Sequence, residues 1–361
     1  MAPPATQFEL AQPPNDAISA LDFAPDSPSR LLVASWDKNV YLYDTHQQSG
    51  ASDDASSSSS SHGTLLQTYE HRAPVMDVCF GADGNEAFTA GMDWQVRRLD
   101  LETGDQVTLS NHAAPVRRVV FSREHSLLVS ASWDSTLSVH NPTNPSLPPL
   151  SVPLPGKPHA LAASPSKVIV AMTSRLVHIY DLAALSAALA SQSAPPSPWQ
   201  QRESSLKFLT RAVAAMPSDA GYATSSIEGR VAVEWFDASA ESQARKYAFK
   251  CHRQAGADGA DVVYPVNALA FHPVHGSTFA SAGGDATVAL WDAEAKRRMK
   301  VYQKFADSVA ALAFSCDGRY LAVGVCPGFE TGMEDYSGEG RTKIFIRELG
   351  ENEALPKGKG K

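Results

Sequence analysis

The sequence predicts an all-β fold, a seven-bladed β-propeller. An acidic turn followed by alternating apolar residues recurs along the chain at intervals of about forty residues, and internal repeats of that length are typical of propellers. Each interval divides into short apolar runs bounded by turn residues, a strand signature, and four strands per unit is the natural count. The seven units begin near Ile18, Val75, Val116, His159, Leu206, Val266 and Val309.

The repeated element is clearest in ASWDKNVYLYD from Ala34, ASWDSTLSVHN from Ala131 and AGGDATVALWD from Ala282. In each, an acidic residue and two small or polar residues precede alternating apolar ones. The period and the terminal WD or YD are typical of WD40 blades, in which His, Ser/Thr, Asp and Trp side chains form hydrogen bonds. His71 and His112 stand at equal distances before a proline, which predicts that blades two and three keep the histidine.

Three segments interrupt the repeat and are expected to be loop insertions in one domain that covers residues 1–350. The first is a serine-rich run, and the third is rich in Gly, Glu and Asp. The second is an Ala/Ser/Pro segment that is expected to be briefly helical before its prolines stop it. The insertions occupy residues 47–63, 182–201 and 326–341.

The two ends of the chain differ in what they predict. Residues 6–10, TQFEL, alternate like a strand but belong to no complete unit. We therefore expect them to form the outer strand of the last blade, because a strand from the other end of the chain closes the ring and removes an exposed sheet edge. Residues 351–361, which end in LPKGKGK, predict a disordered basic tail.

Charge and hydropathy exclude several classes of function. A net charge of −8 and a pI of about 5.8 do not provide the basic face that direct nucleic-acid binding requires. No window approaches the ~18 unbroken apolar residues of a membrane span, and the N-terminus does not resemble a secretion signal, so we expect an intracellular protein without membrane contact. A bound anion must meet a local group of cations, and residues 202–253 carry more basic than acidic side chains.

Motifs of the common hydrolases, nucleotide-binding proteins and metalloproteins are missing, which favours a protein that is not an enzyme and needs no metal or cofactor. The four cysteines lie far apart, as expected for reduced thiols. His272 and His275 occupy a turn position, and Glu330, Glu334 and Asp335 form an acidic loop without a placed base. An enzyme, the alternative class, would need a cluster of carboxylates or histidines around the central channel, and none is apparent.

Three tryptophans predict two different roles. Trp291, in ALWD, is expected to pack inside its blade. Trp36 and Trp133 each stand between the Ser and the Asp of a turn, near one face of the propeller. Tryptophan carries much of the binding energy at interface hot spots, so these two residues are candidate anchors for a peptide.

The fifth unit, SSIEGRVAVEWFD, breaks the pattern because its turn contains Gly229 and then Arg230. A guanidinium offers a planar fork of donors that fits a phosphate, which favours an anion site. The alternative is that Arg230 caps the turn by pairing with Glu228 or Glu234, a surface contact worth ~0–1 kcal/mol. The residues alone leave both interpretations open.

The block QRESSLKFLTRAVAAMPSDAGYATSSIEGRVAVEWFD…KYAFKCHR, with FELAQPPNDAISAL and YPVNALAFHP, resembles a known family. It is similar to the spindle-assembly-checkpoint WD40 proteins of the budding-uninhibited-by-benzimidazole group, the non-kinase partners of the checkpoint kinase. The resemblance covers essentially the whole chain. It implies a seven-bladed propeller without enzymatic activity, found in the nucleus and at the kinetochore in mitosis.

The resemblance also implies two peptide ligands and the residues that bind them. An acidic segment with a paired-glutamate core, from the checkpoint kinase and its pseudokinase or inhibitor relative, would pair with Arg211 and contact Trp36; Trp133 is the second candidate on that surface. Phosphorylated Met-Glu-Leu-Thr repeats of a kinetochore scaffold would be held at the phosphothreonine by Arg230 and Lys250.

The strongest alternative is the sister family of messenger-RNA export factors, which shares similar motifs and binds an acidic segment of a nucleoporin. Asp37 follows Trp36 directly and the leader is short, which favours the checkpoint family. A pulldown that recovers the checkpoint kinase or a nucleoporin would separate the two families.

Overall fold

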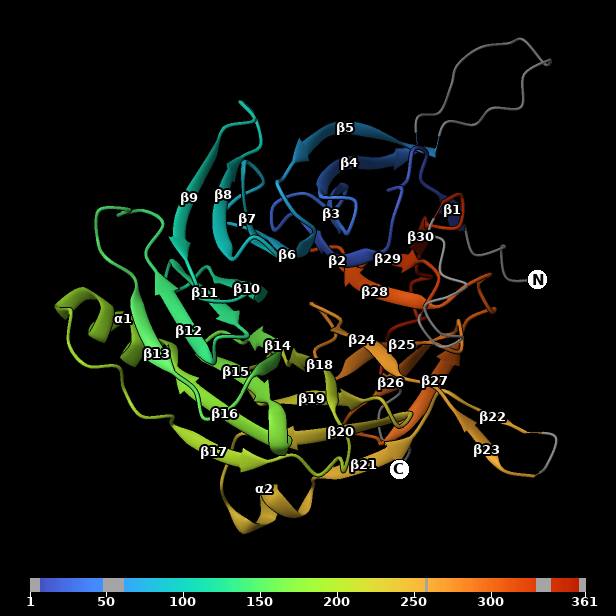
Figure 1. Cartoon of the computed structure of the whole chain (residues 1–361). Coiled ribbons are helices and arrows are strands. Elements are labelled where there is room, and N and C mark those ends of the chain that lie inside the picture. The colour runs from blue at the N-terminus through green and yellow to red at the C-terminus, as the bar shows by residue number, and fades with distance from the viewer. Residues whose placement is uncertain (1–6, 48–61, 257–258, 329–338, 357–361) are drawn as a thin grey trace, which may run out of the picture.

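The computed structural model describes residues 7–47, 62–256, 259–328 and 339–356. Seven four-stranded antiparallel sheets surround a central channel, with their first strands innermost (Figure 1). The predicted seven-bladed, all-β propeller is confirmed. A separate two-stranded hairpin projects between blades five and six. Alternation explains the arrangement, because successive side chains of each strand face the two neighbouring blades, and the cores lie between sheets.

The first four blades follow one another along the chain. Blade one is β2 (Ile18–Phe23), β3 (Arg30–Ser35), β4 (Asn39–Gln47) and β5 (His62–Glu70). Blade two is β6 (Val75–Phe80), β7 (Glu86–Gly91), β8 (Gln95–Asp100) and β9 (Gln106–Asn111). Blade three is β10 (Val116–Ser122), β11 (Leu127–Ser132), β12 (Thr136–His140) and β13 (Leu150–Pro153). Blade four is β14 (Pro158–Ala163), β15 (Lys167–Met172), β16 (Leu176–Asp181) and β17 (Gln200–Glu203), with the 3-10 turn η1 (Thr173–Arg175) before β16.

The remaining blades complete the ring. Blade five is β18 (Thr210–Ala215), β19 (Gly221–Ser226), β20 (Arg230–Trp235) and β21 (Tyr247–Lys250), with helix α2 (Ala240–Ala244) before β21. The projecting hairpin is β22 (Arg253–Ala255) and β23 (Asp261–Val263). Blade six is β24 (Val266–Phe271), β25 (Thr278–Gly283), β26 (Val288–Asp292) and β27 (Arg297–Val301). Blade seven is β28 (Val309–Phe314), β29 (Tyr320–Val325), β30 (Lys343–Glu348) and β1 (Gln7–Glu9).

The N-terminal strand closes the ring, as the sequence predicts. Strand β1 pairs antiparallel with β30, and the backbone N–H of Leu10 continues the ladder to the carbonyl of Ile344 at 2.8 Å. The Leu10 side chain is buried in the core between blades seven and one. Lys343 forms an ion pair with Glu9 at 3.0 Å on the same pair of strands. The last blade is therefore built from both ends of the chain.

Hydrogen bonds inside the blades confirm the histidine assignments. His112 bonds to Asp134 and Ser130, each at 3.0 Å, and His71 bonds to Thr89 at 3.0 Å. Burial lowers the pKa of His71 to about 4, so this ring is neutral at pH 7. Blade six contains a histidine that the sequence analysis did not assign, because His252 bonds to Asp285 and Ser281 at 2.8 Å each. Ser281 also accepts a hydrogen bond from Trp291, whose predicted role inside the blade is confirmed.

The three insertions differ in how far they are described. The second begins with helix α1 (Leu182–Ser191), which confirms the expected helix. Asp181 caps it by accepting a hydrogen bond from the backbone of Ala184 at 2.9 Å. Most of insertions 47–63 and 326–341 lies outside the described residues. Within the described part of the chain, no helix has the length and apolarity needed to cross a membrane.

The C-terminal segment differs from the expected disordered tail as far as residue 356. Ala354 is buried, and its carbonyl accepts a hydrogen bond from Thr278 at 2.8 Å. Glu353 pairs with Lys300 at 2.9 Å and Arg347 at 3.3 Å, so opposite charges hold residues 351–356 on the propeller. The expectation of a disordered tail rested on its basic end alone, and residues 357–361 lie outside the described part.

Candidate functional site

Each innermost strand carries a one-residue bulge at the same end of the channel. In blade three, Val116 pairs with Ser132 and Arg118 with Ala131, so Arg117 is the extra residue. The same register shift occurs in all seven blades. A bulge turns its side chain away from the regular alternation, and bulges are frequent beside functional sites. The seven bulge residues, in blade order, are Ser19, Met76, Arg117, His159, Arg211, Asn267 and Ala310.

A cavity of about 720 Å³ opens at this end of the channel. Six of the bulge residues line it together with Trp36 and Trp133, so the structure brings Arg211 and the two predicted tryptophans into one cavity. The Trp36 backbone N–H bonds to the carbonyl of Ala17 at 2.9 Å, and that of Trp133 to the carbonyl of Pro115 at 3.0 Å. These bonds hold both turns beside the first strand of their own blade. Trp36 is 39% exposed, and Trp133 is half-buried.

The guanidinium of Arg211 is held at the rim of the cavity by blade six. Its Nε donates a hydrogen bond to Oδ1 of Asn267 at 3.1 Å. The amide nitrogen of Asn267 donates in turn to the carbonyl of Val309 at 3.0 Å and to the hydroxyl of Ser308 at 3.2 Å. A guanidinium can pair with a carboxylate through two parallel hydrogen bonds, which suits Arg211 to an acidic ligand.

The turn of blade five shows why Gly229 is needed. Its φ is +63°, in the left-handed region, where the equivalent turns have Lys38, Trp94, Ser135 and Ala286. A Cβ on Gly229 would lie 2.8 Å from the carbonyl oxygen of Cys251 and 3.2 Å from that of His252. The glycine therefore permits both the turn and the close approach of the chain that follows β21.

The acidic residue of this turn also behaves differently from its counterparts. In blades one, two, three and six a short carboxylate accepts a hydrogen bond from the backbone N–H two residues on, as Asp134 does from Thr136 at 3.0 Å. Glu228, with its longer side chain, accepts instead from the backbone of Lys207 at 3.3 Å and lies 3.6 Å from Nε of Arg230. The carboxylate of Glu228 therefore does not cap its own turn by accepting a hydrogen bond from the backbone N–H of the residue after Gly229.

Arg230 and Lys250 are directly opposite each other on β20 and β21. Side chains of opposed residues leave the same face of a sheet with Cβ atoms roughly 5 Å apart, so two cations lie side by side here. The Arg230 side chain is 34% exposed and Lys250 is exposed. The pair with Glu228 is long for an ion pair, and Glu234 is bound elsewhere, to Tyr222 at 3.0 Å and Arg202 at 3.4 Å. Arg230 and Lys250 do not line the channel-mouth cavity.

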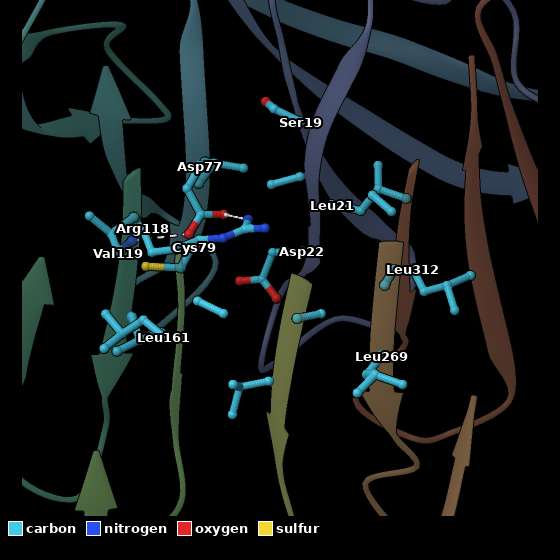
Figure 2. A pocket seen from close by; sticks show the side chains of 18 of the residues that line it. Ser19, Leu21, Asp22, Asp77, Cys79, Arg118, Val119, Leu161, Leu269 and Leu312 are labelled. Carbon is cyan, nitrogen blue, oxygen red and sulfur yellow. Dashed lines mark hydrogen bonds and ion pairs between the residues drawn. The ribbon is translucent and has the colours of Figure 1, made fainter. Parts of the chain in front are cut away.

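Two carboxylates line the channel, where no cluster of carboxylates or histidines was apparent in the sequence. Figure 2 shows the side chains of Asp22 and Asp77 in this pocket, together with the guanidinium of Arg118. Asp77 accepts hydrogen bonds from Arg118 at 3.2 Å and from the backbone of Val119 at 3.0 Å. Asp22 accepts from the backbone of Phe80 at 2.8 Å, and burial raises the pKa of this carboxyl to about 6. Both carboxylates bind the neighbouring blade, which is a structural role.

Among the described residues, no group of three or more His, Cys, Asp or Glu side chains could hold a metal ion. His272 bonds to the carbonyl of Gly318 at 3.0 Å and accepts from the backbone of His275 at 2.9 Å, which is a turn contact.

Sequence reasoning missed Arg117 and His159 as residues of the channel mouth. The signal was the basic pair in VRRVVF, at a point where the first and second units have SA and MD. Alternation alone places consecutive arginines on opposite faces, and only the bulge allows Arg117 and Arg118 to line the same cavity.

Comparison with known proteins agrees with this architecture. A model of the WD domain, G-beta repeat, matches residues 7–44, 63–98, 105–141 and 258–292. The mitotic checkpoint protein BUB3.1 of Arabidopsis thaliana is 40% identical over 360 residues, 99% of this chain and 96% of that protein. The mitotic checkpoint protein bub-3 of Caenorhabditis elegans is 33% identical over 97% of this chain and 96% of its own length. A poly(A)+ RNA export protein of Schizosaccharomyces pombe is 31% identical over 97% of this chain and 93% of its own.

A closed ring of seven WD40 blades with a side-chain-lined cavity at one mouth defines a WD40 scaffold protein, a class without enzymatic activity. The chain belongs to the family of the BUB3 mitotic checkpoint proteins, and the Rae1 and Gle2 messenger-RNA export factors are nearby relatives.

Proposed function

We propose that this protein is an adaptor of the spindle assembly checkpoint that binds two peptides on separate surfaces. The first is an acidic segment of the checkpoint kinase and of its pseudokinase or inhibitor relative. The second is a phosphorylated Met-Glu-Leu-Thr repeat of a kinetochore scaffold. Such an adaptor acts in the nucleus and at the kinetochore in mitosis. Similarity to the mitotic checkpoint proteins over nearly the full chain supports this proposal.

One observation carries the assignment of the acidic segment. Trp36, Trp133 and Arg211 line a single cavity whose described lining contains arginines and no aspartate or glutamate. Indole rings provide packing area at low entropic cost, and a guanidinium pairs with carboxylates through two parallel hydrogen bonds. An acidic, extended peptide therefore fits the chemistry of this cavity.

Calorimetry with a synthetic acidic segment that contains two adjacent glutamates tests this assignment. Arg211→Glu should abolish binding, because it adds repulsion and leaves a ligand carboxylate unpaired, a loss of several kcal/mol. Arg319→Glu is the matched control, since Arg319 is an exposed arginine in the β28–β29 turn, at the other end of blade seven. Wild-type affinity in Arg211→Glu, with the fold intact, would show that the segment binds another surface.

The phosphothreonine is assigned to Arg230 and Lys250. Opposed cations on β20 and β21 provide a local positive site in a protein of net charge −8. Binding requires Arg230 to exchange its long contact with Glu228 for a phosphate, which offers a higher charge and shorter hydrogen bonds. This site does not share lining residues with the cavity of Arg211, so both peptides can be bound together.

The alternative function is that of a messenger-RNA export factor that binds a nucleoporin segment. Two relatives named as RNA export proteins are 29% and 31% identical over 97% of this chain. The acidic-segment surface serves either function, whereas Arg230 and Lys250 are needed only for the phosphothreonine. A pulldown from mitotic extract that recovers the checkpoint kinase favours the checkpoint role, and one that recovers a nucleoporin favours the alternative.

A further inference from the structure

The turn between the first and second strands carries the same four-residue pattern in two blades. Residues 27–30 of blade one read SPSR, between β2 and β3, and residues 164–167 of blade four read SPSK, between β14 and β15. Proline keeps the serine before it extended, as a peptide is in a kinase groove, and provides no N–H donor after it. A serine followed by proline, with a basic residue two positions further on, is the acceptor pattern of proline-directed protein kinases. Both turns lie at the end of the strands opposite the channel-mouth bulges.

The copy in blade four is closed by a carboxylate of blade five. Ser164 is buried, and its hydroxyl donates a hydrogen bond to Oδ1 of Asp219 at 2.5 Å. Ser166 donates to Oδ2 of the same residue, also at 2.5 Å, and Oγ of Ser164 accepts from the backbone of Lys167 at 3.2 Å. Short bonds from a hydroxyl to a carboxylate are charge-assisted and strong. The folded turn therefore withholds Ser164 from a phosphoryl donor.

The copy in blade one is open. Ser27 is half-buried, and its Oγ lies 3.3 Å from the hydroxyl and 3.4 Å from the backbone nitrogen of Ser29, two long contacts inside its own turn. Asp26, beside it, accepts instead from the backbone N–H of Gly84 in blade two at 3.0 Å. Within the described part of the chain, no carboxylate accepts a hydrogen bond from Ser27. Its hydroxyl can thus be released without separating two blades.

The same turn contains a guanidinium that suits a phosphate. Nη1 of Arg30 donates to Oδ1 of Asn85 in blade two at 3.4 Å, and its Nε is buried without a hydrogen-bond partner among the described residues. A Cβ on Gly84 would lie 2.7 Å from Oδ1 of Asp26 and 3.3 Å from Nη1 of Arg30, so both side chains lie against one residue of blade two. A phosphate on Ser27 adds roughly −1.5 to −2 charges, which repel the carboxylate and attract the guanidinium.

We propose that Ser27 is a phosphorylation site for a proline-directed serine kinase, and that its phosphate weakens the contact of this turn with blade two. The kinase transfers the γ-phosphoryl group of ATP: the bond from phosphorus to the β-phosphate oxygen breaks and a bond to Oγ of Ser27 forms. ADP leaves, and the hydroxyl proton passes to a base of the kinase. Asp26 is then repelled from the N–H of Gly84, and Arg30 exchanges Asn85 for the phosphate.

A kinase reaction on the folded protein tests the site, with Mg-ATP, a cyclin-dependent kinase with its cyclin, and mass spectrometry to locate the phosphate. Ser27 should be modified at least roughly 10-fold faster than Ser164, since a charge-assisted hydrogen bond must first break at Ser164. Synthetic peptides of residues 22–33 and 159–170 should be modified at similar rates, because no fold closes either. Asp219→Gly, which the φ of +58° at Asp219 tolerates, should speed the reaction at Ser164. An unmodified Ser27 in the folded protein, or equal rates at the two serines, would overturn the proposal.

Hydrogen exchange of the Gly84 amide tests the effect on blade two, because this N–H donates to Asp26. Exchange should be several-fold faster in the phosphorylated protein than in the unmodified one. Ser27→Ala, treated with kinase in the same way, is the matched control and should exchange like the unmodified protein. Equal exchange at Gly84 with and without phosphate on Ser27 would overturn the proposed loosening.

Discussion

Asn267 of blade six positions Arg211 of blade five, through a 3.1 Å hydrogen bond from Nε of the arginine to Oδ1 of the amide. Both are bulge residues of their blades, and Asn267 is anchored to blade seven through the carbonyl of Val309. Three blades thus determine where one guanidinium lies. A side chain held in this way loses less entropy when a carboxylate binds.

Asn267→Ala should therefore weaken binding of the acidic segment by about 1 kcal/mol, the usual value of one hydrogen bond, because Arg211 is no longer positioned. Asn267→Asp should weaken binding further, because a fixed carboxylate competes with the ligand for Arg211. Calorimetry with the synthetic acidic segment that contains two adjacent glutamates measures both effects. Tighter binding by Asn267→Asp would show that Arg211 does not meet a carboxylate of the ligand.

Stability should fall as pH rises through the titration range of Asp22. The folded state raises the pKa of this carboxyl from 3.8 to about 6, so the folded protein holds a proton that the unfolded chain releases. The folded state is therefore favoured most below pH 4, and this contribution is lost as the pH rises to 6. Asp22→Asn can still accept the hydrogen bond from Phe80 and should be more stable than wild type at pH 7.5, by about 2 kcal/mol.

Urea unfolding of wild type and Asp22→Asn at pH 4, 5, 6 and 7.5 checks this. The difference between the two proteins should grow with pH and nearly vanish at pH 4. Parallel curves across that range would mean that the carboxyl of Asp22 is not held protonated by the fold.

Gly229 and Ala286 provide a matched pair of turn substitutions. Gly229→Ala should destabilise the protein by about 2 kcal/mol, because a left-handed φ is combined with a Cβ 2.8 Å from the carbonyl oxygen of Cys251. Ala286 has φ +62° in the equivalent turn. Ala286→Gly should stabilise the protein by roughly 1 kcal/mol, because glycine adopts this left-handed conformation without the cost that alanine bears. Chemical denaturation measures both, and opposite signs are expected. A destabilised Ala286→Gly would show that its methyl packing outweighs the backbone strain.

Removal of residues 1–12 should lower the melting temperature sharply, because it exposes the edge of β30 and empties the site of Leu10. The hydroxyl of Tyr43 also loses its hydrogen bond to the carbonyl of Gln12 at 2.6 Å. Leu10→Ala should cost 2–5 kcal/mol by cavity formation alone. Calorimetric unfolding tests both proteins, and a melting temperature equal to that of wild type would contradict closure of the ring by β1.

The fold could be predicted from the sequence because each feature of the repeat has a local sequence pattern. This holds for the acidic turns, for the alternating apolar runs and for the N-terminal strand before Leu10 that belongs to no complete unit. Closure of the ring follows because an exposed sheet edge is unfavourable. His252 was not assigned from the sequence because the following hairpin separates it from Ser281 and Asp285, to which it is hydrogen-bonded. Hydrogen bonds between residues so far apart along the chain leave no local sequence pattern.

The site was predictable only in part, for a different reason. Trp36 and Trp133 were predicted from their position in the repeat and Arg211 from the resemblance to the checkpoint family, but Arg117 and His159 depend on a backbone bulge. A one-residue register shift exchanges the two faces of a strand, and a sequence does not show where the shift occurs. The role of Glu228 was also not predictable from the sequence, because the length of its side chain decides whether its carboxylate caps its own turn or accepts from the backbone of Lys207.

In the proposed function, a phosphothreonine peptide and an acidic segment bind to separate cationic sites on one propeller. Titration of labelled Met-Glu-Leu-Thr peptides, with and without phosphate, onto protein saturated with the acidic segment is the decisive measurement. We expect the phosphorylated peptide to bind much more tightly, Arg230→Ala to lose roughly 1.5–3 kcal/mol of that binding and Lys250→Ala less, with the acidic segment still bound. Equal affinity of wild type for the two peptides would contradict the account and leave Arg230 as a partner of Glu228 in its turn.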